Sequence, residues 1–345
     1  MRQPARPVSF RSFRSIRCLR LLPSLRLLLP AVLLLLTTAC TLIPSGGHPA
    51  GPIGKGTRHP LTATFLGNST LLIDDGTDQI LIDGFLTRPG LLPVAAGRIR
   101  THPPTVDAAL HRAGATRIRA LFVSHSHYDH ALDAAYVIHR TKRLQQTGAI
   151  LHGSGSTLNI GRGGDLAGSD MAPFQPRVPI RIGRHFTVTV IPSKHSDPIP
   201  GINSDLGQTI DKPLLQPARA KAYTEGGSYD FLIRHRGRSI LVKASASYLP
   251  GALDRIKADV LFLGVTGLGS KAPAARDDFY RNTVQQVNAR QVIPIHWDNF
   301  LCPLSEHLPI LLPRDRDGLH YLQQRLTADG RHYQLLQGYQ TITIP

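Results

Sequence analysis

Cysteine is scarce in this sequence of 345 residues, which contains only Cys18, Cys40 and Cys302. The first two lie within the N-terminal 40 residues, so Cys302 is the single cysteine in the rest of the sequence. A disulfide framework is therefore excluded as the source of stability. Aromatic residues are also few, at 6%, and no aromatic-basic motif indicates nucleic-acid binding. The rest of the chain, about 300 residues, is long enough to bury a core without covalent help.

Acidic residues are absent from residues 1–39. The first 26 residues hold seven arginines, and residues 27–36 form a short apolar run that contains Pro30. A membrane span needs about 20 apolar residues, so this arrangement is typical of an export signal. Cys40 directly follows the small residues Thr-Thr-Ala, which resembles a bacterial lipobox. We predict a lipoprotein signal peptide at residues 1–39 and lipid on Cys40; simple secretion and an uncleaved anchor are the alternatives.

Without residues 1–39 the formal net charge falls from +17 to +10, because seven of the 40 Lys+Arg and none of the 23 Asp+Glu lie there. The remaining charge is spread along the chain, which suits anionic lipid headgroups or anionic substrates. We expect no nucleic-acid partner. The predicted location is the cell envelope, and Thr41 after the lipidated cysteine favours the outer membrane, periplasmic side, in a bacterium with two membranes. The sequence leaves the oligomeric state open.

Residues 40–58 are rich in Gly and Pro and are predicted to be a flexible tether, followed by one domain at residues 59–345. Strands are predicted at residues 61–66, 70–74, 79–83, 118–123, 149–152, 186–192, 229–235, 239–243, 259–264 and 291–295, with a strand pair at the C-terminus. Helices are predicted at residues 106–113, 131–146 and 276–289 and after residue 315. This α/β pattern predicts two sheets packed face to face and covered by helices. Residues 196–227 lack periodicity, and we interpret them as a lid.

The stretch LFVSHSHYDHALD, residues 121–133, places three histidines and two aspartates where a buried strand passes into a helix. His125 and His127 are two residues apart, so both side chains can point the same way from extended backbone. Asp129 and His130 follow closely enough to face a neighbouring point. Imidazole and carboxylate groups suit zinc and similar divalent ions. The stretch therefore predicts a metal site rather than a polar loop that caps the helix.

Three further strand ends carry side chains of the same kinds. His195 follows FTVTVIPSK, His296 follows QVIPI, and Asp83 closes the strand in ILIDGF. A single histidine at a strand end usually has a structural role, but three such ends in one chain favour convergence at one rim. We predict that His195 and His296 complete the metal site. Asp133, three residues after His130, and Asp83 are candidates to hydrogen-bond a ligand histidine.

This set of residues resembles the metallo-β-lactamase superfamily across residues 59–310. The intact HxHxDH motif at residues 125–130 and the two later histidines carry the resemblance. The stretches IPIHWDNF and FLGNSTLLI look most like the branch that contains N-acyl-phosphatidylethanolamine phospholipase D and ascorbate-phosphate lactonase. The resemblance implies a four-layer αββα sandwich with the metal site at one edge.

The resemblance also implies which residues bind metal. One ion would be held by His125, His127 and His195. A second ion would be held by Asp129, His130 and His296. Zinc is the expected metal, as one or two ions, with manganese or iron as alternatives. Asp129 and His130 are the residues that we assign to catalysis.

The sequence departs from the family pattern at two positions. Ser245 stands where the family has an aspartate that bridges both ions, and Asn68 replaces an early histidine. Without the bridge, the second ion should bind more weakly and the site should be more positive. Lys243 is interpreted either as part of this positive site or as a solvated surface lysine. Glu225 is interpreted as a replacement acid or, alternatively, as a plain turn carboxylate.

These features predict a metal-dependent hydrolase in which a metal-bound hydroxide attacks an ester, lactone or phosphodiester. A small-molecule or lipid-linked anionic substrate is favoured. Two alternatives remain: a non-catalytic envelope lipoprotein that binds a metal or ligand, and an iron-dependent redox enzyme. The absent bridging aspartate supports the first alternative, and a set of two histidines and one carboxylate supports the second.

Overall fold

The computed structural model describes residues 59–145, 148–197 and 205–345. The predicted signal peptide, the lipidation site at Cys40 and the tether lie outside the described residues. Within the described ranges, no helix combines the length and the apolar character that a membrane crossing requires.

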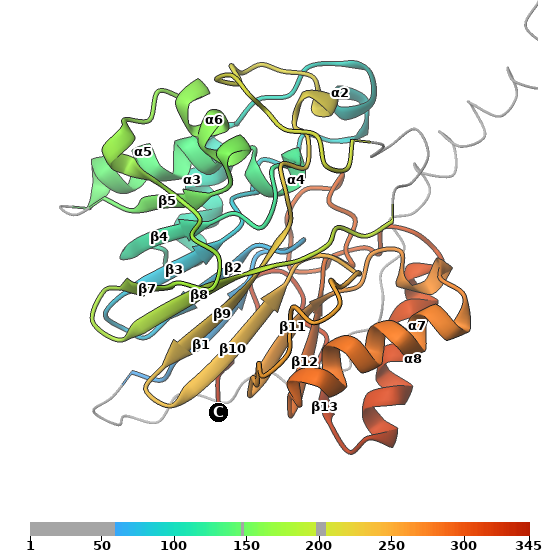
Figure 1. The fold of residues 1–345 in the computed structure, drawn as a ribbon. Coiled ribbons are helices and arrows are strands. Elements are labelled where there is room, and N and C mark those ends of the chain that lie inside the picture. Colours follow the sequence, from blue (N-terminus) through green and yellow to red (C-terminus); the bar gives the residue numbers. More distant parts are fainter. Residues whose placement is uncertain (1–58, 146–147, 198–204) are drawn as a thin grey trace, which may run out of the picture. The chain divides into compact units, whose positions relative to one another are not determined.

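Two seven-stranded sheets form the framework of the domain (Figure 1). The first sheet contains, in spatial order, β14 (Thr341–Thr343), β1 (Thr62–Phe65), β2 (Leu71–Asp74), β3 (Gln79–Ile82), β4 (Ile118–Phe122), β5 (Ile150–Gly153) and β6 (Met171–Pro173). The second contains β13 (His332–Tyr333), β12 (Gln291–Ile295), β11 (Val260–Gly264), β10 (Arg238–Lys243), β9 (Tyr229–His235), β8 (Phe186–Pro192) and β7 (Pro179–Ile182).

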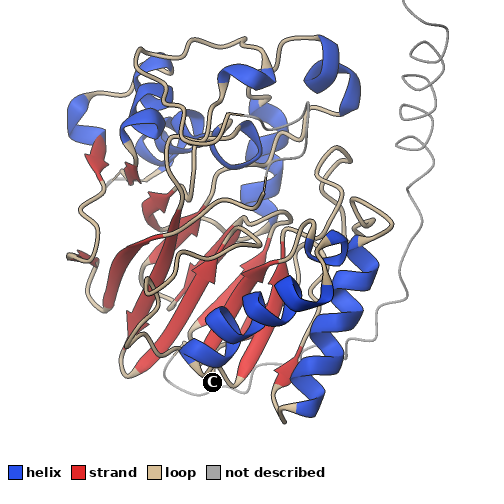
Figure 2. Ribbon diagram, turned by 45° about the vertical axis from the view of Figure 1, so that its right-hand side comes forward, coloured by secondary structure: helices blue, strands red, loops and turns tan. Residues whose placement is uncertain are grey.

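Helices cover the outer side of each sheet (Figures 1 and 2). The helices on the side of the first sheet are α2 (Leu91–Ala96), α3 (Pro103–Arg112), α4 (Tyr128–Ala131), α5 (Ala134–Leu144) and α6 (Gly155–Gly163). The second sheet is covered by α7 (Pro273–Tyr280), which continues into a π-helical turn at Arg281–Gln285, and by α8 (Asp315–Ala328).

The side chains of residues 120–123, which cover the end of β4 and the residue after it, alternate between two apolar cores. Ala120 and Phe122 belong to the core that joins the sheets, where Phe122 lies 5.5 Å from Phe231 between ring centroids. Leu121 and Val123 point the other way, into the core under α3 and α5. All five residues of β11 are buried, as expected for a parallel strand covered on both faces. The layers are helix, sheet, sheet and helix, which confirms the predicted αββα sandwich.

Strand direction brings several strand ends to one edge of the sandwich. β3, β4 and β5 are parallel neighbours, and so are β10, β11 and β12. β8 is antiparallel to β9, which is antiparallel to β10, so β8 also runs in the direction of β10. The residues that follow β3, β4, β8 and β12 therefore lie at the carboxyl edge, where α/β folds place their binding sites.

The structure differs from the predicted elements in several places. The predicted C-terminal strand pair is wrong, because β13 pairs with β12 and β14 pairs with β1, in different sheets. The predicted helix at residues 131–146 begins later, as α5, and a separate short helix, α4, precedes it. α2, β6 and β7 were not predicted. α6 was not predicted because three glycines weaken its helical pattern; its first turn is held by Ser154, whose side chain accepts a hydrogen bond from the Thr157 N–H.

The described part of the segment interpreted as a lid, residues 205–227, packs against the domain. Ala218 is buried and forms an isolated antiparallel bridge with Ile99. Ile210 is also buried, and its N–H donates to Ser156 Oγ at 2.8 Å. These contacts make residues 205–227 a packed cover rather than a loop extended into solvent. Residues 198–204 of the predicted lid lie outside the described residues.

Candidate metal centre

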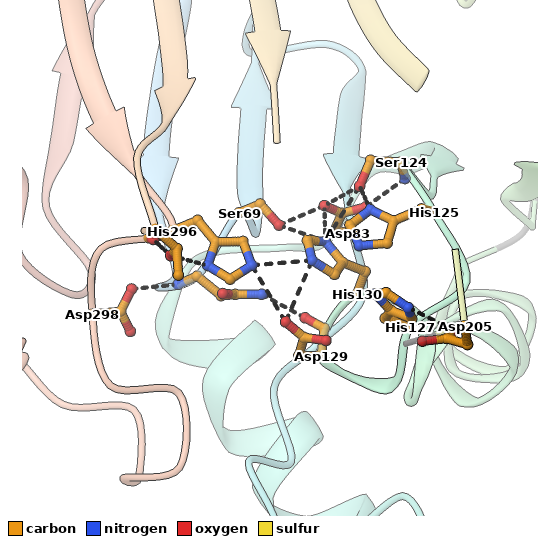
Figure 3. A network of polar contacts seen from close by, with 12 residues as sticks. Ser69, Asp83, Ser124, His125, His127, Asp129, His130, Asp205, His296 and Asp298 are labelled. Carbon is orange, nitrogen blue, oxygen red and sulfur yellow. Dashed lines mark hydrogen bonds and ion pairs between the residues drawn. The ribbon is translucent and has the colours of Figure 1, made fainter. Parts of the chain in front are cut away.

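The six predicted ligands converge where the strand ends of the two sheets meet. Figure 3 labels five of them, all except His195. They form two groups, and the ligand atoms of each group lie within 4.8 Å of one another. The first ligand group comprises His125, His127 and His195. The second ligand group comprises Asp129, His130 and His296. The first sheet supplies the motif after β4, and the second sheet supplies the histidines after β8 and β12.

Each histidine of the first ligand group keeps one ring nitrogen for a shared ion. Nδ1 of His195 donates to the Ser196 carbonyl oxygen at 2.8 Å, and Nε2 of His127 donates to Asp205 Oδ2 at 3.0 Å. These contacts leave Nε2 of His195 and Nδ1 of His127. Nε2 of His125 is buried and has no hydrogen-bond partner within the described residues. An orphaned buried nitrogen is costly, and a metal ion would satisfy it.

The first ligand group favours neutral imidazoles. Burial, reinforced by the neighbouring charge of His130, lowers the pKa of His125 well below its usual value. Burial, reinforced by His127, lowers the pKa of His195 to about 4. At neutral pH both rings are therefore unprotonated, which is the state that binds metal.

The second ligand group brings three atoms together even without an ion. Nε2 of His130 lies 3.2 Å from Nε2 of His296, and the two nitrogens lie 3.4 and 3.3 Å from Asp129 Oδ2. The remote nitrogens are held from behind. Nδ1 of His130 donates to Asp83 Oδ2 at 2.8 Å, and Nδ1 of His296 lies 2.7 Å from Thr266 Oγ1. Partners of this kind orient metal-binding histidines.

The second ligand group has the opposite electrostatic character. Burial opposes a charge on His130, but the carboxylates of Asp129 and Asp83 outweigh it and raise the pKa of His130 to about 10. Burial likewise opposes ionisation of Asp129, but the charge of His130 and hydrogen bonds from both histidines hold the pKa of Asp129 well below its usual value. Without metal, His130 is therefore an imidazolium between two carboxylates.

Asp83 is the anchor of the second ligand group. It is fully buried and accepts hydrogen bonds from Ser69 Oγ at 2.5 Å, from Ser124 N–H at 2.6 Å and from Ser124 Oγ at 3.0 Å. The structure thus places Asp83 behind a ligand histidine, in the role that its position at a strand end suggested. The two serines were missed, although both lie in stretches that the sequence had marked, directly before His125 and within FLGNST.

Asn68, the residue in place of a family histidine, ties the backbone of the second ligand group together. Its Nδ2 donates to the Asp129 carbonyl oxygen at 2.6 Å, and its own carbonyl oxygen accepts the His296 N–H at 2.5 Å. The Asn68 N–H donates to Asp298 Oδ1 at 2.7 Å. Asp298 in turn forms a fully buried ion pair with Arg88. A side chain that the sequence marked as a loss therefore has a structural role.

Two interpretations of charged residues are corrected by the structure. Asp133 contacts no ligand histidine; its carboxylate accepts the N–H groups of Leu86 and Thr87, each at 2.7 Å, and so holds the loop after β3. Lys243 is neither a solvated lysine nor a free positive charge. It is 1% exposed, and its Nζ lies 3.0 Å from Asp230 Oδ2. That carboxylate offsets its charge, so Lys243 adds little positive potential at the site.

The structure also bears on the interpretations of Ser245 and Glu225. Ser245 is buried, two residues beyond the end of β10, and neither ligand group found among the described residues includes a donor from that turn. Glu225 is a turn carboxylate: Oε2 accepts the Gly207 N–H and Oε1 accepts Ser228 Oγ, both at 2.7 Å. Its role as a replacement acid is not supported by these contacts.

The donor chemistry fits divalent transition metals. Three neutral imidazoles with one more position open suit catalytic zinc. Two imidazoles and one carboxylate suit zinc and equally manganese or iron. His125 and His130 are 2% and 0% exposed, whereas the side chains of His127, Asp129 and His296 are 11–12% exposed. His125 and His130 are therefore the most deeply buried of these five ligands, at the floor of the centre, and the other three are more accessible.

The fold and the two ligand groups define a metalloprotein of the αββα class. Residues 78–297 match the family model described as "Beta-lactamase superfamily domain", and the chain belongs to this family. A search of curated proteins gives no match.

Among solved structures, the chain is similar to Igni18, a metallo hydrolase from the hyperthermophilic archaeon Ignicoccus hospitalis. The identity is 14% and the TM-score 0.53, and the match covers 83% of this chain and 98% of that one. It is also similar to the isothiocyanate hydrolase from Delia radicum gut bacteria, at 12% identity and TM-score 0.50, with 82% and 99% covered. At these identities the likeness shows a shared fold.

Proposed function

We propose that the protein is a metal-dependent hydrolase that cleaves an anionic ester, lactone or phosphodiester. One observation carries the proposal: six ligand atoms converge in two adjacent groups, and five of them belong to histidine rings whose other nitrogen already contacts a protein group. Such preorganisation is typical of a catalytic centre.

Some residues of the centre would hold the metal ions, and others would line the path of the substrate. Bound ions would supply Lewis-acid chemistry, polarising the scissile group and lowering the pKa of a coordinated water to about 7. His125 and His130 close the floor of the centre and exclude bulk water, while the substrate enters past His127, Asp129 and His296. Asp129 and His130, which we assign to catalysis, are held in one charge network with Asp83.

The anionic character of the substrate rests on the charge count of the ligands. Two divalent ions would bring four positive charges against the single ligand carboxylate of Asp129. Because Asp230 offsets Lys243, this preference depends on the ions and not on that lysine. The resemblance to the phospholipase-containing branch and the predicted lipid on Cys40 favour a lipid-linked phosphoester. We accordingly propose that the lipid anchors the protein in the cell envelope, on the periplasmic side of the outer membrane if the bacterium has two membranes.

One observation favours a second candidate function. Asp129, His130 and His296 form a set of two histidines and one carboxylate, which also suits iron redox chemistry. Elemental analysis and an iron absorption or EPR signal in the purified protein would favour this candidate. Zinc or manganese without such a signal would favour hydrolysis.

Replacement of two ligands tests the hydrolase proposal. His125→Ala/His127→Ala should lower turnover of a phosphodiester, an ester and a lactone by about 1,000-fold or more, because the first ligand group can no longer hold an ion. Turnover is measured together with metal content per chain. The control is His111→Ala/His320→Ala, which removes two exposed histidines and should change neither. Unchanged turnover in the ligand variant would refute the metal mechanism, and metal binding without turnover of any substrate would favour a non-catalytic lipoprotein.

A further inference from the structure

A carboxylate from the packed cover meets the first ligand group (Figure 3). Oδ2 of Asp205 lies 3.0 Å from Nε2 of His127, and the two side chains are 20% and 11% exposed. The other two histidines of this group have neutral partners: His195 donates to a carbonyl oxygen, and Nδ1 of His125 lies 3.2 Å from Ser124 Oγ. His127 is thus the member of the first ligand group with a carboxylate on its remote nitrogen.

This contact decides which nitrogen of His127 can bind metal. An ionised carboxylate only accepts hydrogen bonds, so Nε2 of His127 must carry the proton. The lone pair is then on Nδ1, the nitrogen that remains for a shared ion. A carboxylate behind a metal-binding histidine also increases the basicity of the ring and fixes its orientation.

Asp205 is itself held in register with the metal-binding motif. The same Oδ2 accepts the Glu225 N–H at 2.9 Å. The Glu225 carbonyl oxygen accepts the N–H of Ser126 at 2.8 Å, and Ser126 lies between His125 and His127 in the chain. The path from Asp205 through Glu225 thus returns to the backbone of Ser126, the residue directly before His127. This closed path sets the carboxylate at a fixed place relative to the ring.

We propose that Asp205 is a positioning residue that fixes His127 as an Nδ1 ligand and thereby sets the metal affinity of the first ligand group. The inference rests on the proposed metal-dependent function. It assigns a specific task to the cover: residues 205–227 complete the support of a ligand that the HxHxDH motif alone leaves unsupported on one side.

Zinc affinity tests the inference without reference to activity. Competition with a chromophoric chelator is measured for His296→Ala, which disables the second ligand group, and for the same protein with Asp205→Asn or Asp205→Ala added. We expect zinc to bind about 10-fold more weakly in the Asn variant and about 100-fold more weakly in the Ala variant. Histidine ¹⁵N NMR of the metal-free proteins supplies the second readout: His127 should be the Nε2–H tautomer with Asp205 and a mixture with Ala.

A matched variant separates the loss of the His127 contact from the loss of a carboxylate elsewhere on the segment. Asp211→Asn removes an exposed carboxylate that contacts Thr209. It should keep wild-type zinc affinity and His127 tautomer. An equal loss of affinity in Asp211→Asn, or unchanged affinity and tautomer in Asp205→Ala, would overturn the inference. Failure of the wild-type protein to bind zinc would instead refute the proposed metal-dependent function.

Discussion

The two ligand groups lie side by side at one edge of the sandwich but are built on different electrostatic principles. In the first, burial lowers the pKa of His125 and of His195 and so suppresses the charge of these two rings. In the second, the carboxylates of Asp129 and Asp83 enclose His130 and raise its pKa. The first group therefore contains two neutral rings, whereas the second contains a protonated His130 whose charge the two carboxylates offset.

This difference predicts unequal behaviour toward metal. An ion entering the first ligand group displaces no proton from His125 or His195. An ion that enters the second ligand group must displace the proton of His130 and so break the ion pair between His130 and Asp129. Both groups lack the bridging carboxylate expected at the position of Ser245, and its absence should weaken the second ion more, as the sequence predicts. We therefore expect the first ligand group to fill before the second.

Removing Asp83, the carboxylate behind His130, should change the difference in metal affinity between the two groups most. Asp83→Ala should weaken metal binding at the second ligand group by about 100-fold, because it removes the partner that orients the ring. It should also lower the free energy of unfolding by about 1–3 kcal/mol, because the buried donors of Ser69 and Ser124 lose their acceptor. Both are measured, by metal competition and by urea denaturation.

Asp133→Ala is the matched control for Asp83. Asp133 is equally buried and equally engaged, since it accepts from Leu86, from Thr87 N–H and from Thr87 Oγ1 at 2.6–2.7 Å. It should cost similar stability but leave metal affinity unchanged. A parallel loss of metal affinity in the control would mean that fold stability, and not ring orientation, controls the second ligand group.

The second-largest expected difference between the two groups is the pH dependence of their metal affinities. With the pKa of His130 raised to about 10, the ring is protonated from pH 6 to 9, so each unit of acidification should weaken the second ligand group about tenfold. His125 and His195 have lowered pKa values and should add no such slope in this range. Affinities measured between pH 6 and 9 in His296→Ala and in His125→Ala isolate the two groups. Equal slopes would contradict the comparison.

Much of the centre could be predicted because its ligands follow strands with regular patterns. The HxHxDH motif, His195, His296 and Asp83 each end an apolar run, and the parallel strands bring those ends to one edge. Asp205 could not be found in this way. It lies in a Pro/Gly-rich segment without periodicity, so nothing in the sequence indicates which residue of the segment reaches the metal site.

Two charged residues show what local reasoning can and cannot supply. The hairpin of β9 and β10 places Val242 opposite Phe231, and Ile240 opposite Ile233. Continuing that register puts Lys243 opposite Asp230, whereas the predicted three-residue turn at residues 236–238 would have paired it with Phe231. Asp133 is different, because the break between α4 and α5 turns its carboxylate toward the loop after β3. A spacing of three residues from His130 predicts contact only if the helix is continuous.

Restoring the missing bridging carboxylate should have the smallest effect, and it should make the metal affinities of the two groups more similar. Ser245→Asp adds a carboxylate at the position where the family has its bridging aspartate, and added ligand charge tightens metal sites. We expect the second ligand group to bind a metal ion up to about tenfold more tightly, because Asp129 is its only charged ligand in the wild-type protein. The affinity of the first ligand group should change less. Ser247→Asp, two residues further along the same buried turn, is the control for an added acid. If Ser245→Asp instead weakened both groups, the turn after β10 would lie away from the ions, and the unequal affinities would then arise from the proton on His130 alone.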